Sequence, residues 1–338
     1  MKAARFHAHG GPEVLRYEEA PDPAPADGRV IVRVRACGLN HLDLWQRRGL
    51  ERVKIPLPHI SGADVAGEIV DGGDVFSTGA RVLLQPGLSC GRCEACREGR
   101  DNECAEYSVL GYMSDGGYAE LVSVPLENVV PIPGHVDFIS AAAFPLTFLT
   151  AWHMLLTRAG LRPADTVLVL AGGSGVGQAA IQIARLHGAR VFATSGPSKM
   201  DASRALGAEE VFDHYTEDFS KRVRALTEGR GADIVVEHVG EATWDRSVRA
   251  LARGGRLVTC GTTSGHHAAI DLRHLFARQL SLLGSYMGRK AELLRAASLF
   301  FEGQLRPVID EVIPLAEVRR AHERLEASRH FGKIVLEV

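Results

Sequence analysis

Four closely spaced cysteines are the strongest chemical signal in the sequence. The pattern C-x2-C-x2-C-x7-C is formed by Cys90, Cys93, Cys96 and Cys104. Four thiolates at this spacing can close a tetrahedron around one Zn²⁺ and leave no position open for a substrate. The pattern therefore predicts one structural zinc ion per chain. An iron–sulfur cluster is an alternative for the same cysteines, but no other feature of the sequence supports it.

A glycine-rich loop lies between an apolar strand, predicted over 166–170, and a helix, predicted over 178–186. Glycines let the backbone turn tightly and approach a pyrophosphate, whose charge then meets the free N–H groups at the start of the helix. No Gly-Lys-Ser/Thr follows, which argues against a Walker A loop. The loop predicts a dinucleotide site that contains Gly172, Gly173, Ser174, Gly175, Val176 and Gly177.

The end of the next predicted strand bears on which dinucleotide binds. Sites that prefer NAD usually place Asp or Glu there, about 20 residues beyond the loop, to bind the ribose 2′-hydroxyl. Here the position holds Ser195, which can donate to a 2′-phosphate, and Lys199 follows four residues later to pair with that phosphate. We therefore expect NADPH to be favoured over NADH.

Two different sequence patterns surround these motifs. The first 125 residues are β-rich, with alternating apolar positions such as Val30, Val32 and Val34 and frequent Gly and Pro turns, which is typical of a compact antiparallel barrel. From 166 to 284, six short apolar segments alternate with helical patterns, which favours a doubly wound parallel sheet. Two helical stretches and a final strand over 333–338 follow. We expect an α/β protein of two domains.

Composition and charge restrict the function classes. The chain has 338 residues, with 39 Lys+Arg against 41 Asp+Glu and a net charge of −2, which gives no reason to expect a nucleic-acid partner. The start lacks the apolar region of a signal peptide, and the apolar stretch 139–156 contains Pro145 and His153. We expect a cytoplasmic protein without a membrane span.

Together, these motifs and their order make the chain resemble the medium-chain dehydrogenase/reductase superfamily over essentially its whole length. The opening Gly-Gly-Pro-Glu-Val-Leu at 10–15 resembles the quinone oxidoreductase branch, and the cysteine segment 90–104 resembles that of zinc alcohol dehydrogenases. The resemblance implies a GroES-like β-barrel catalytic domain over 1–126 and 287–338 and a Rossmann domain over 127–286. It also implies a homodimer or a tetramer. In such dimers of the family, the last Rossmann strand often pairs with the same strand of the second chain.

The same resemblance reveals a departure at the catalytic centre. Zinc alcohol dehydrogenases carry Cys-Gly-x-Cys-x-Thr/Ser-Asp, whereas this chain has Cys-Gly-Leu-Asn-His-Leu-Asp at 37–43. The positions of the three catalytic-zinc ligands fall on Asn40, Ala63 and Leu146, none of which is a zinc ligand. Asn40 with Asp43 instead resembles the Asn-x-x-Asp of quinone and enoyl reductases.

The resemblance also carries cofactor roles onto this chain. It places Asn40 near the nicotinamide, Tyr215 and Arg329 against the adenosine phosphate and Lys333 near the pyrophosphate. Thr150, which matches a threonine of the family, is a further expected cofactor contact. The remaining expected contacts lie at the ends of predicted strands: Val239, Gly240, Cys260, Gly261 and Ser285.

The reaction we expect is hydride transfer from NADPH to a small, apolar, electron-poor acceptor, a quinone or an α,β-unsaturated carbonyl. Asn40 would donate a hydrogen bond to the developing oxyanion, and His41 and Asp43 are the nearest candidate proton carriers. Two alternatives remain: an alcohol or aldehyde dehydrogenase with unusual zinc ligands, and a non-catalytic NADPH-binding protein.

Overall fold

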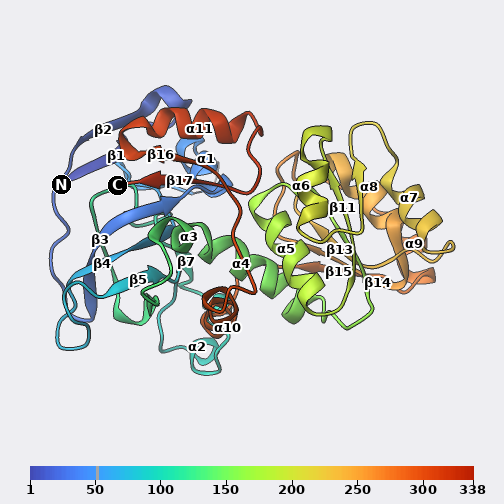
Figure 1. Cartoon of the computed structure of the whole chain (residues 1–338), viewed down its shortest axis with the longest axis horizontal. Helices are drawn as coiled ribbons and strands as arrows, with labels where there is room; N and C mark the ends of the chain where they lie inside the picture. Colours follow the sequence, from blue (N-terminus) through green and yellow to red (C-terminus); the bar gives the residue numbers. More distant parts are fainter. Residues whose placement is uncertain (51–52) are drawn as a thin grey trace. The chain divides into compact units, whose positions relative to one another are not determined.

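The computed structural model describes residues 1–50 and 53–338, and these form two compact units. Unit 1 consists of Met1–Leu146 and Arg289–Val338, and unit 2 consists of Thr147–Gly288. Unit 2 is thus one continuous segment inserted into a discontinuous unit 1. In Figure 1, the red C-terminal strand β17 returns to the blue strands of the same unit. No helix in the described part of the chain is long and apolar enough to cross a membrane.

Unit 1 is built on a seven-stranded sheet with the order β16-β17-β3-β4-β5-β9, in which β8 also pairs with β3. All of its pairings are antiparallel except that of β16 with β17. Two further antiparallel pairs, β1 with β2 and β6 with β7, lie outside it. The strands are β1 (Lys2–Phe6), β2 (Leu15–Glu19), β3 (Arg29–Gly38), β4 (Asp64–Asp71), β5 (Arg81–Leu84), β6 (Gly87–Leu88), β7 (Ser108–Val109), β8 (Leu121–Pro125), β9 (Val129–Pro131), β16 (Ile309–Pro314) and β17 (Lys333–Glu337).

The alternation predicted for β3 is present. Val30, Val32 and Val34 are buried in the core of unit 1, whereas Arg33 and Arg35 are exposed. Alternate side chains of a strand point to opposite faces of its sheet, so β3 contributes one apolar face to the core. As the central strand, β3 also carries its carboxyl end, Gly38, between β17 and β4, where it is in register with Val335 and Asp64.

The helices of unit 1 are α1 (His41–Arg48), α2 (Glu94–Arg97), α3 (Phe138–Ala143), α10 (Lys290–Phe301) and α11 (Val318–Glu326). The position of α3 corrects the predicted domain boundary, which lies at residue 146 rather than 126. A Cβ on Gly38 would lie 2.4 Å from the carbonyl oxygen of Ala142, so α3 packs directly on β3. α4 (Pro145–Trp152) follows and continues as a π-helix over His153–Arg158.

Unit 2 contains the six-stranded parallel sheet that the sequence predicts, with the order β12-β11-β10-β13-β14-β15. The order reverses between β10 and β13, which is the point where doubly wound folds bind dinucleotides. The strands are β10 (Thr166–Val169), β11 (Arg190–Ser195), β12 (Glu210–Asp213), β13 (Ala232–Glu237), β14 (Leu251–Thr259) and β15 (Ser281–Gly284). The helices are α5 (Gly175–Leu186), α6 (Met200–Ala205), α7 (Phe219–Leu226), α8 (Glu241–Ala250) and α9 (Leu272–Ala277).

Candidate active site, cofactor loop and zinc lobe

The four cysteines predicted to hold zinc lie together in the segment between β6 and β7. Their Sγ atoms all lie within 4.8 Å of one another, and those of Cys90 and Cys96 are 4.0 Å apart. Tetrahedral Zn–S bonds of about 2.3 Å require sulfur–sulfur separations of roughly 3.8 Å, so this donor set fits one Zn²⁺. Backbone N–H groups of Arg92 and Cys93 lower the pKa of the Cys90 thiol to about 6, which favours the thiolate that zinc binds.

The glycine-rich loop joins β10 to α5, as the sequence predicts. Ser174 caps the helix, because its Oγ accepts a hydrogen bond of 2.9 Å from the N–H of Gly177. A Cβ on Gly177 would lie 2.2 Å from the carbonyl oxygen of Ala171, so the turn requires glycine there. The other N–H groups of the first turn of α5 have no partner inside the helix and are available to a phosphate.

A second loop, after β13, meets the glycine loop at the reversal of the strand order. Nε2 of His238 lies 3.0 Å from Oγ of Ser174. Burial lowers the pKa of His238 to about 4, so the imidazole is neutral at pH 7. Glu237 is fully buried and accepts hydrogen bonds from the N–H groups of Val239 and Gly240, which fixes the start of α8.

The other predicted cofactor residues of unit 2 mostly follow the carboxyl ends of its strands. Because the strands are parallel and in register, these ends share one edge of the sheet. Three buried hydroxyls among them have no hydrogen-bond partner in the described chain: those of Thr150, in α4, Ser195 and Ser285. Buried polar groups normally have a hydrogen-bond partner, so these three hydroxyls are consistent with a polar ligand that would complete the site. The residues of unit 2 therefore fit a dinucleotide.

Three of the residues from which the sequence predicts NADPH binding lie near the end of β11. Ser195 ends that strand and is 1% exposed. A Cβ on its neighbour Gly196 would lie 3.2 Å from the ring of Tyr215, which is 77% exposed. Lys199 lies in the next turn and is half-buried. Arg329, the other predicted phosphate contact, lies in unit 1 and is exposed.

In unit 1, the candidate catalytic residue Asn40 lies where β3 passes into α1. It occupies the N-cap position of α1. Its amide lies between two charged groups: Oδ1 accepts from Nζ of Lys333 at 2.7 Å, and Nδ2 donates to Oδ2 of Asp64 at 2.9 Å. These partners come from β17 and β4, the two strands that flank β3.

This geometry corrects the expected role of Lys333. Its ammonium donates to the carbonyl oxygen of Leu39 at 2.6 Å, to Asn40 at 2.7 Å and to Oδ2 of Asp64 at 2.9 Å. An ammonium has three N–H donors, and all three are used. Lys333 is also only 2% exposed. It therefore has no donor left for a pyrophosphate and belongs to the surroundings of Asn40.

The two candidate proton carriers differ in their environments. Asp43 is buried, and its Oδ2 accepts from the N–H of Asn40 at 2.7 Å and from the hydroxyl of Tyr118 at 2.9 Å. Burial raises the pKa of Asp43 to about 6, although these hydrogen bonds oppose the rise. His41, the first residue of α1, is half-buried, and its ring centroid lies 6.5 Å from that of Trp45. Three apolar side chains of this unit, those of Leu42, Trp45 and Leu146, are partly exposed.

A catalytic zinc does not fit this part of unit 1. The positions of its expected ligands hold Asn40, Ala63 and Leu146, and the ammonium of Lys333 already pairs with Asp64. A divalent cation beside that ammonium would be repelled, and the amide and aliphatic side chains offer it no replacement charge. Within the described ranges, the only group of three or more potential metal ligands is the cysteine cluster.

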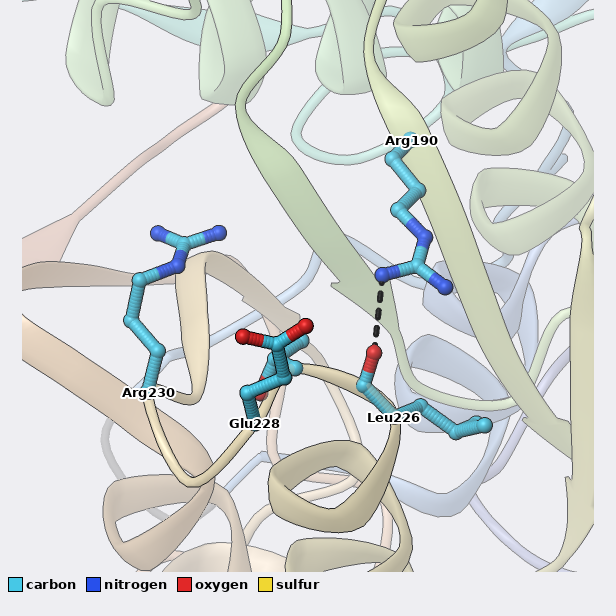
Figure 2. A pocket seen from close by; sticks show the side chains of 5 residues that line it. Arg190, Leu226, Glu228 and Arg230 are labelled. Atoms are coloured by element: carbon cyan, nitrogen blue, oxygen red, sulfur yellow. Dashed lines mark hydrogen bonds between the residues drawn. The ribbon is translucent and has the colours of Figure 1, made fainter.

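A pocket of about 340 Å³ in unit 2 is separate from these sites. Arg190, at the start of β11, and Arg230, just before β13, place it at the amino ends of the strands, opposite the glycine loop (Figure 2). Its cations are already engaged: Arg190 pairs with Glu209 and donates to the carbonyl of Leu226, and Arg230 pairs with Asp233. We assign it no role in the reaction.

Comparisons with known proteins identify the family. The model of the alcohol dehydrogenase GroES-like domain matches residues 26–134, and that of the zinc-binding dehydrogenases matches residues 175–302. The chain is 34% identical to a quinone oxidoreductase of Pseudomonas aeruginosa, covering 99% of both chains. It is 32% identical to an NAD-dependent alcohol dehydrogenase of Sulfolobus acidocaldarius, covering 100% of both. The chain belongs to the medium-chain dehydrogenase/reductase family.

A solved structure supports the same assignment for this dehydrogenase/reductase. The crystal structure of an NAD-dependent alcohol dehydrogenase matches it with a TM-score of 0.97 and 47% sequence identity over 100% of both chains. The predicted fold class and the predicted oxidoreductase activity are therefore confirmed at the level of the family. The relatives carry the names of two reactions, quinone reduction and NAD-linked alcohol oxidation, so their names do not choose between these substrates.

Sequence reasoning missed three buried or loop-forming residues of the candidate sites in this dehydrogenase/reductase. It did not assign Glu237 or His238, which organise the loop after β13. Nor did it assign Asp64, which pairs with Lys333. A carboxylate at the start or end of an otherwise apolar strand is the signal that could have identified Asp64 and Glu237, since such a group is buried only with partners.

Proposed function

We propose that this dehydrogenase/reductase transfers hydride from NADPH to a quinone or an α,β-unsaturated carbonyl, without zinc at its catalytic centre. The observation that carries the proposal is the amide of Asn40, which is held between Lys333 and Asp64. The resemblance to zinc alcohol dehydrogenases assigns a catalytic-zinc ligand to this position. NADPH supplies the hydride when bound. The residues of the chain bind the two reactants, exclude water and stabilise the negative charge that develops on oxygen.

The acceptor class follows from what an amide can do. Quinones and enones delocalise the charge of the added hydride onto an oxygen, and one hydrogen bond to that oxygen lowers the barrier. A simple alcohol or ketone needs stronger polarisation, such as a Lewis-acid metal supplies. The partly exposed apolar side chains of Leu42, Trp45 and Leu146 suit a flat, apolar acceptor.

A screen of acceptors tests the proposal directly. NADPH consumption would be measured with quinones, enones, aldehydes and ketones, and NAD⁺ reduction with simple alcohols, with zinc content determined on the same sample. We expect turnover of a quinone or enone that survives brief chelation, with one zinc ion per chain. A protein that carries two tightly bound zinc ions and loses activity reversibly with a chelator would refute the zinc-free mechanism.

Asn40→Ala should slow the reaction, because it removes a donor to the developing oxyanion. The expected loss in kcat is about 10²–10³-fold, the range for removing one oxyanion donor. Steady-state kinetics on protein shown to be folded by circular dichroism would measure it. Arg48→Gln, on the exposed side of the same helix, is the matched control and should leave kcat within about twofold of the original. Equal rates for the original protein and Asn40→Ala would remove Asn40 from the mechanism.

NADPH preference rests on Ser195, with Tyr215 beside Gly196 and Lys199 in the next turn. NADPH should bind more tightly than NADH to the original protein. Ser195→Asp should reverse the order, because a carboxylate accepts the ribose 2′-hydroxyl and repels a 2′-phosphate. Calorimetric titration of both cofactors into both proteins measures this. Tighter NADH binding by the original protein would refute the preference.

NAD-linked alcohol oxidation is the second candidate. The names of two similar proteins favour it, one of which is 47% identical to this chain. It predicts NAD⁺ reduction by a simple alcohol in the screen above and a chelator-sensitive second metal ion. The first candidate predicts neither result, so one set of samples distinguishes them.

A further inference from the structure

The two groups that hold the amide of Asn40 are chemical opposites. An ammonium such as that of Lys333 offers only donors, and a carboxylate such as that of Asp64 offers only acceptors. The oxygen of the amide must therefore face Lys333, 2.7 Å away, and its nitrogen must face Asp64, 2.9 Å away. A reversed amide would place its N–H groups against the ammonium and its oxygen against the carboxylate. One orientation of the side chain is thus strongly favoured.

The pair that imposes this orientation, Lys333 and Asp64, is itself held in place. Nζ of Lys333 also donates to the carbonyl oxygen of Leu39, and Oδ1 of Asp64 accepts from the N–H of Leu146 at 2.7 Å. Lys333 is 2% exposed and Asp64 is fully buried. Neither side chain can turn toward a substrate without leaving the other's charge unpaired in the interior, which is strongly unfavourable.

Asn40 alone in this group keeps an unused donor. Its Nδ2 carries two hydrogens, and one of them goes to Asp64. The second has no acceptor among the residues that the structure describes. Its oxygen accepts from a cation, which withdraws electron density from the amide and strengthens the remaining N–H as a donor.

We propose that Lys333 and Asp64 are positioning residues that fix and polarise the amide of Asn40, so that one N–H remains for the oxygen of the electron acceptor. This inference rests on the proposed function, because that function gives the N–H its task. Lys333 and Asp64 touch neither the acceptor nor the cofactor in this scheme. They act on the rate only through Asn40.

Neutral variants of nearly equal size test the proposal kinetically. Lys333→Gln and Asp64→Asn allow the amide to reverse, because glutamine and asparagine side chains both donate and accept. We expect each variant to lose about 10–100-fold in kcat, less than the loss for Asn40→Ala, while KM for the acceptor changes less than about threefold. Lys333→Arg keeps a donor-only partner and should recover part of kcat.

A matched control separates positioning from general loss of stability. Arg324→Gln breaks another ion pair of unit 1, that of Arg324 with Asp310, whose charged atoms are 2.6 Å apart. It should lower the midpoint of thermal unfolding without changing kcat of the folded protein. If Arg324→Gln lowers kcat as much as Lys333→Gln does, or if Lys333→Gln and Asp64→Asn keep kcat within about twofold, the positioning role is wrong.

The side-chain amide resonances of Asn40 give a readout that does not need turnover. In ¹⁵N-labelled protein, the pair that disappears in Asn40→Ala should show two well-separated proton shifts, one slow in solvent exchange through its bond to Asp64. In Asp64→Asn, this pair should move together and exchange faster. An unchanged pair would overturn the inference even if the enzyme reduces quinones. Lack of quinone or enone turnover by the original protein would refute the proposed function, while the resonances would still report the amide orientation.

Discussion

Asp43 shows how a buried carboxylate can make the stability of unit 1 depend on pH. It bonds the N–H of Asn40 and the hydroxyl of Tyr118 through one oxygen, while its other oxygen, Oδ1, has no partner within the described chain. Burial is the largest influence on its pKa, which lies at about 6, above the usual value of 3.8. One oxygen of the carboxylate is thus hydrogen-bonded, whereas the other is buried without a donor from the described residues, which disfavours the ionised form.

The direction of the pH effect follows from this raised pKa. Between about pH 4 and pH 6, the folded state binds more protons at Asp43 than the unfolded state does, so the free energy of unfolding falls as the pH rises. The fall amounts to at most about 3 kcal/mol and is complete above the folded pKa. Asp43→Asn cannot ionise and should flatten this slope.

Denaturant unfolding at several pH values between about 4 and 7 measures that slope for both proteins. Asp74→Asn, which changes an exposed carboxylate in the same unit, serves as the control and should keep the original slope. An Asp43→Asn variant with the original slope would show that another group is responsible.

At the scale of single residues, the sequence predicts which residues belong to a local motif better than it predicts which side chains contact one another. The cysteine spacing and the glycine loop are local patterns, so their members could be found by reading along the chain. The contact between Asn40 and Lys333 joins residues 293 positions apart, and it forms only because β17 pairs with β3. Nothing local to Lys333 distinguishes a buried partner of Asn40 from a surface cation near a phosphate.

At the scale of elements, the segment 90–104 is held by very little secondary structure. It contains the single-turn helix α2 and a 3₁₀ turn over Asp101–Glu103, and Cys90, Cys93 and Cys96 are only partly buried. So short a segment buries little apolar surface, and a metal that binds only the folded form would supply the missing stability.

Cys93→Ala should therefore abolish stoichiometric zinc binding and lower the midpoint of thermal unfolding, because three thiolates leave the tetrahedron open. The hydride-transfer rate of the protein that remains folded should stay within about twofold of the original. Metal analysis and calorimetry on the same preparation test this. Cys260→Ala, outside the cluster, should keep one zinc ion per chain. Full zinc content in Cys93→Ala would contradict the assigned ligand set.

The strand pattern explains which elements could be predicted. All six strands of unit 2 are short apolar runs between helices, and each prediction is confirmed. In unit 1, β16 was not predicted, because Ile309–Pro314 contains Asp310 and Glu311 and is mostly half-buried. Its parallel pairing with β17 depends on the return of the C-terminal segment to unit 1, which the local pattern does not encode.

At the scale of the whole molecule, β15 is an edge strand of the parallel sheet. Unpaired N–H and C=O groups along an edge can pair with another chain. The preceding helix α9 exposes two large apolar side chains, Leu272 at 65% and Phe276 at 70%. These features are consistent with the homodimer that the resemblance implies, in which β15 pairs with its copy in a second chain.

Leu283→Glu, in the middle of this edge, should convert a dimer to monomers, because it places like charges close together across the symmetric pairing. Analytical ultracentrifugation at several concentrations measures the change. Val75→Glu, which replaces an exposed apolar residue of unit 1, should leave the association state unchanged. A Leu283→Glu variant that remains as associated as the original would place the interface elsewhere.

The insertion of unit 2 into unit 1 also fixes an order of events during synthesis. All of unit 2 has been made once residue 288 has been translated, whereas unit 1 still lacks β16 and β17. Lys333 is added 293 residues after Asn40, which corresponds to roughly 15–60 s at ordinary translation rates. Until β17 is made, β3 has no partner along Ala36–Gly38, the part that β17 will cover, and Asp64 has no counter-ion from Lys333. The nascent chain therefore carries an unpaired stretch of β3 and a carboxylate without its cation until β17 is made, which happens only after the whole of unit 2 has been synthesised.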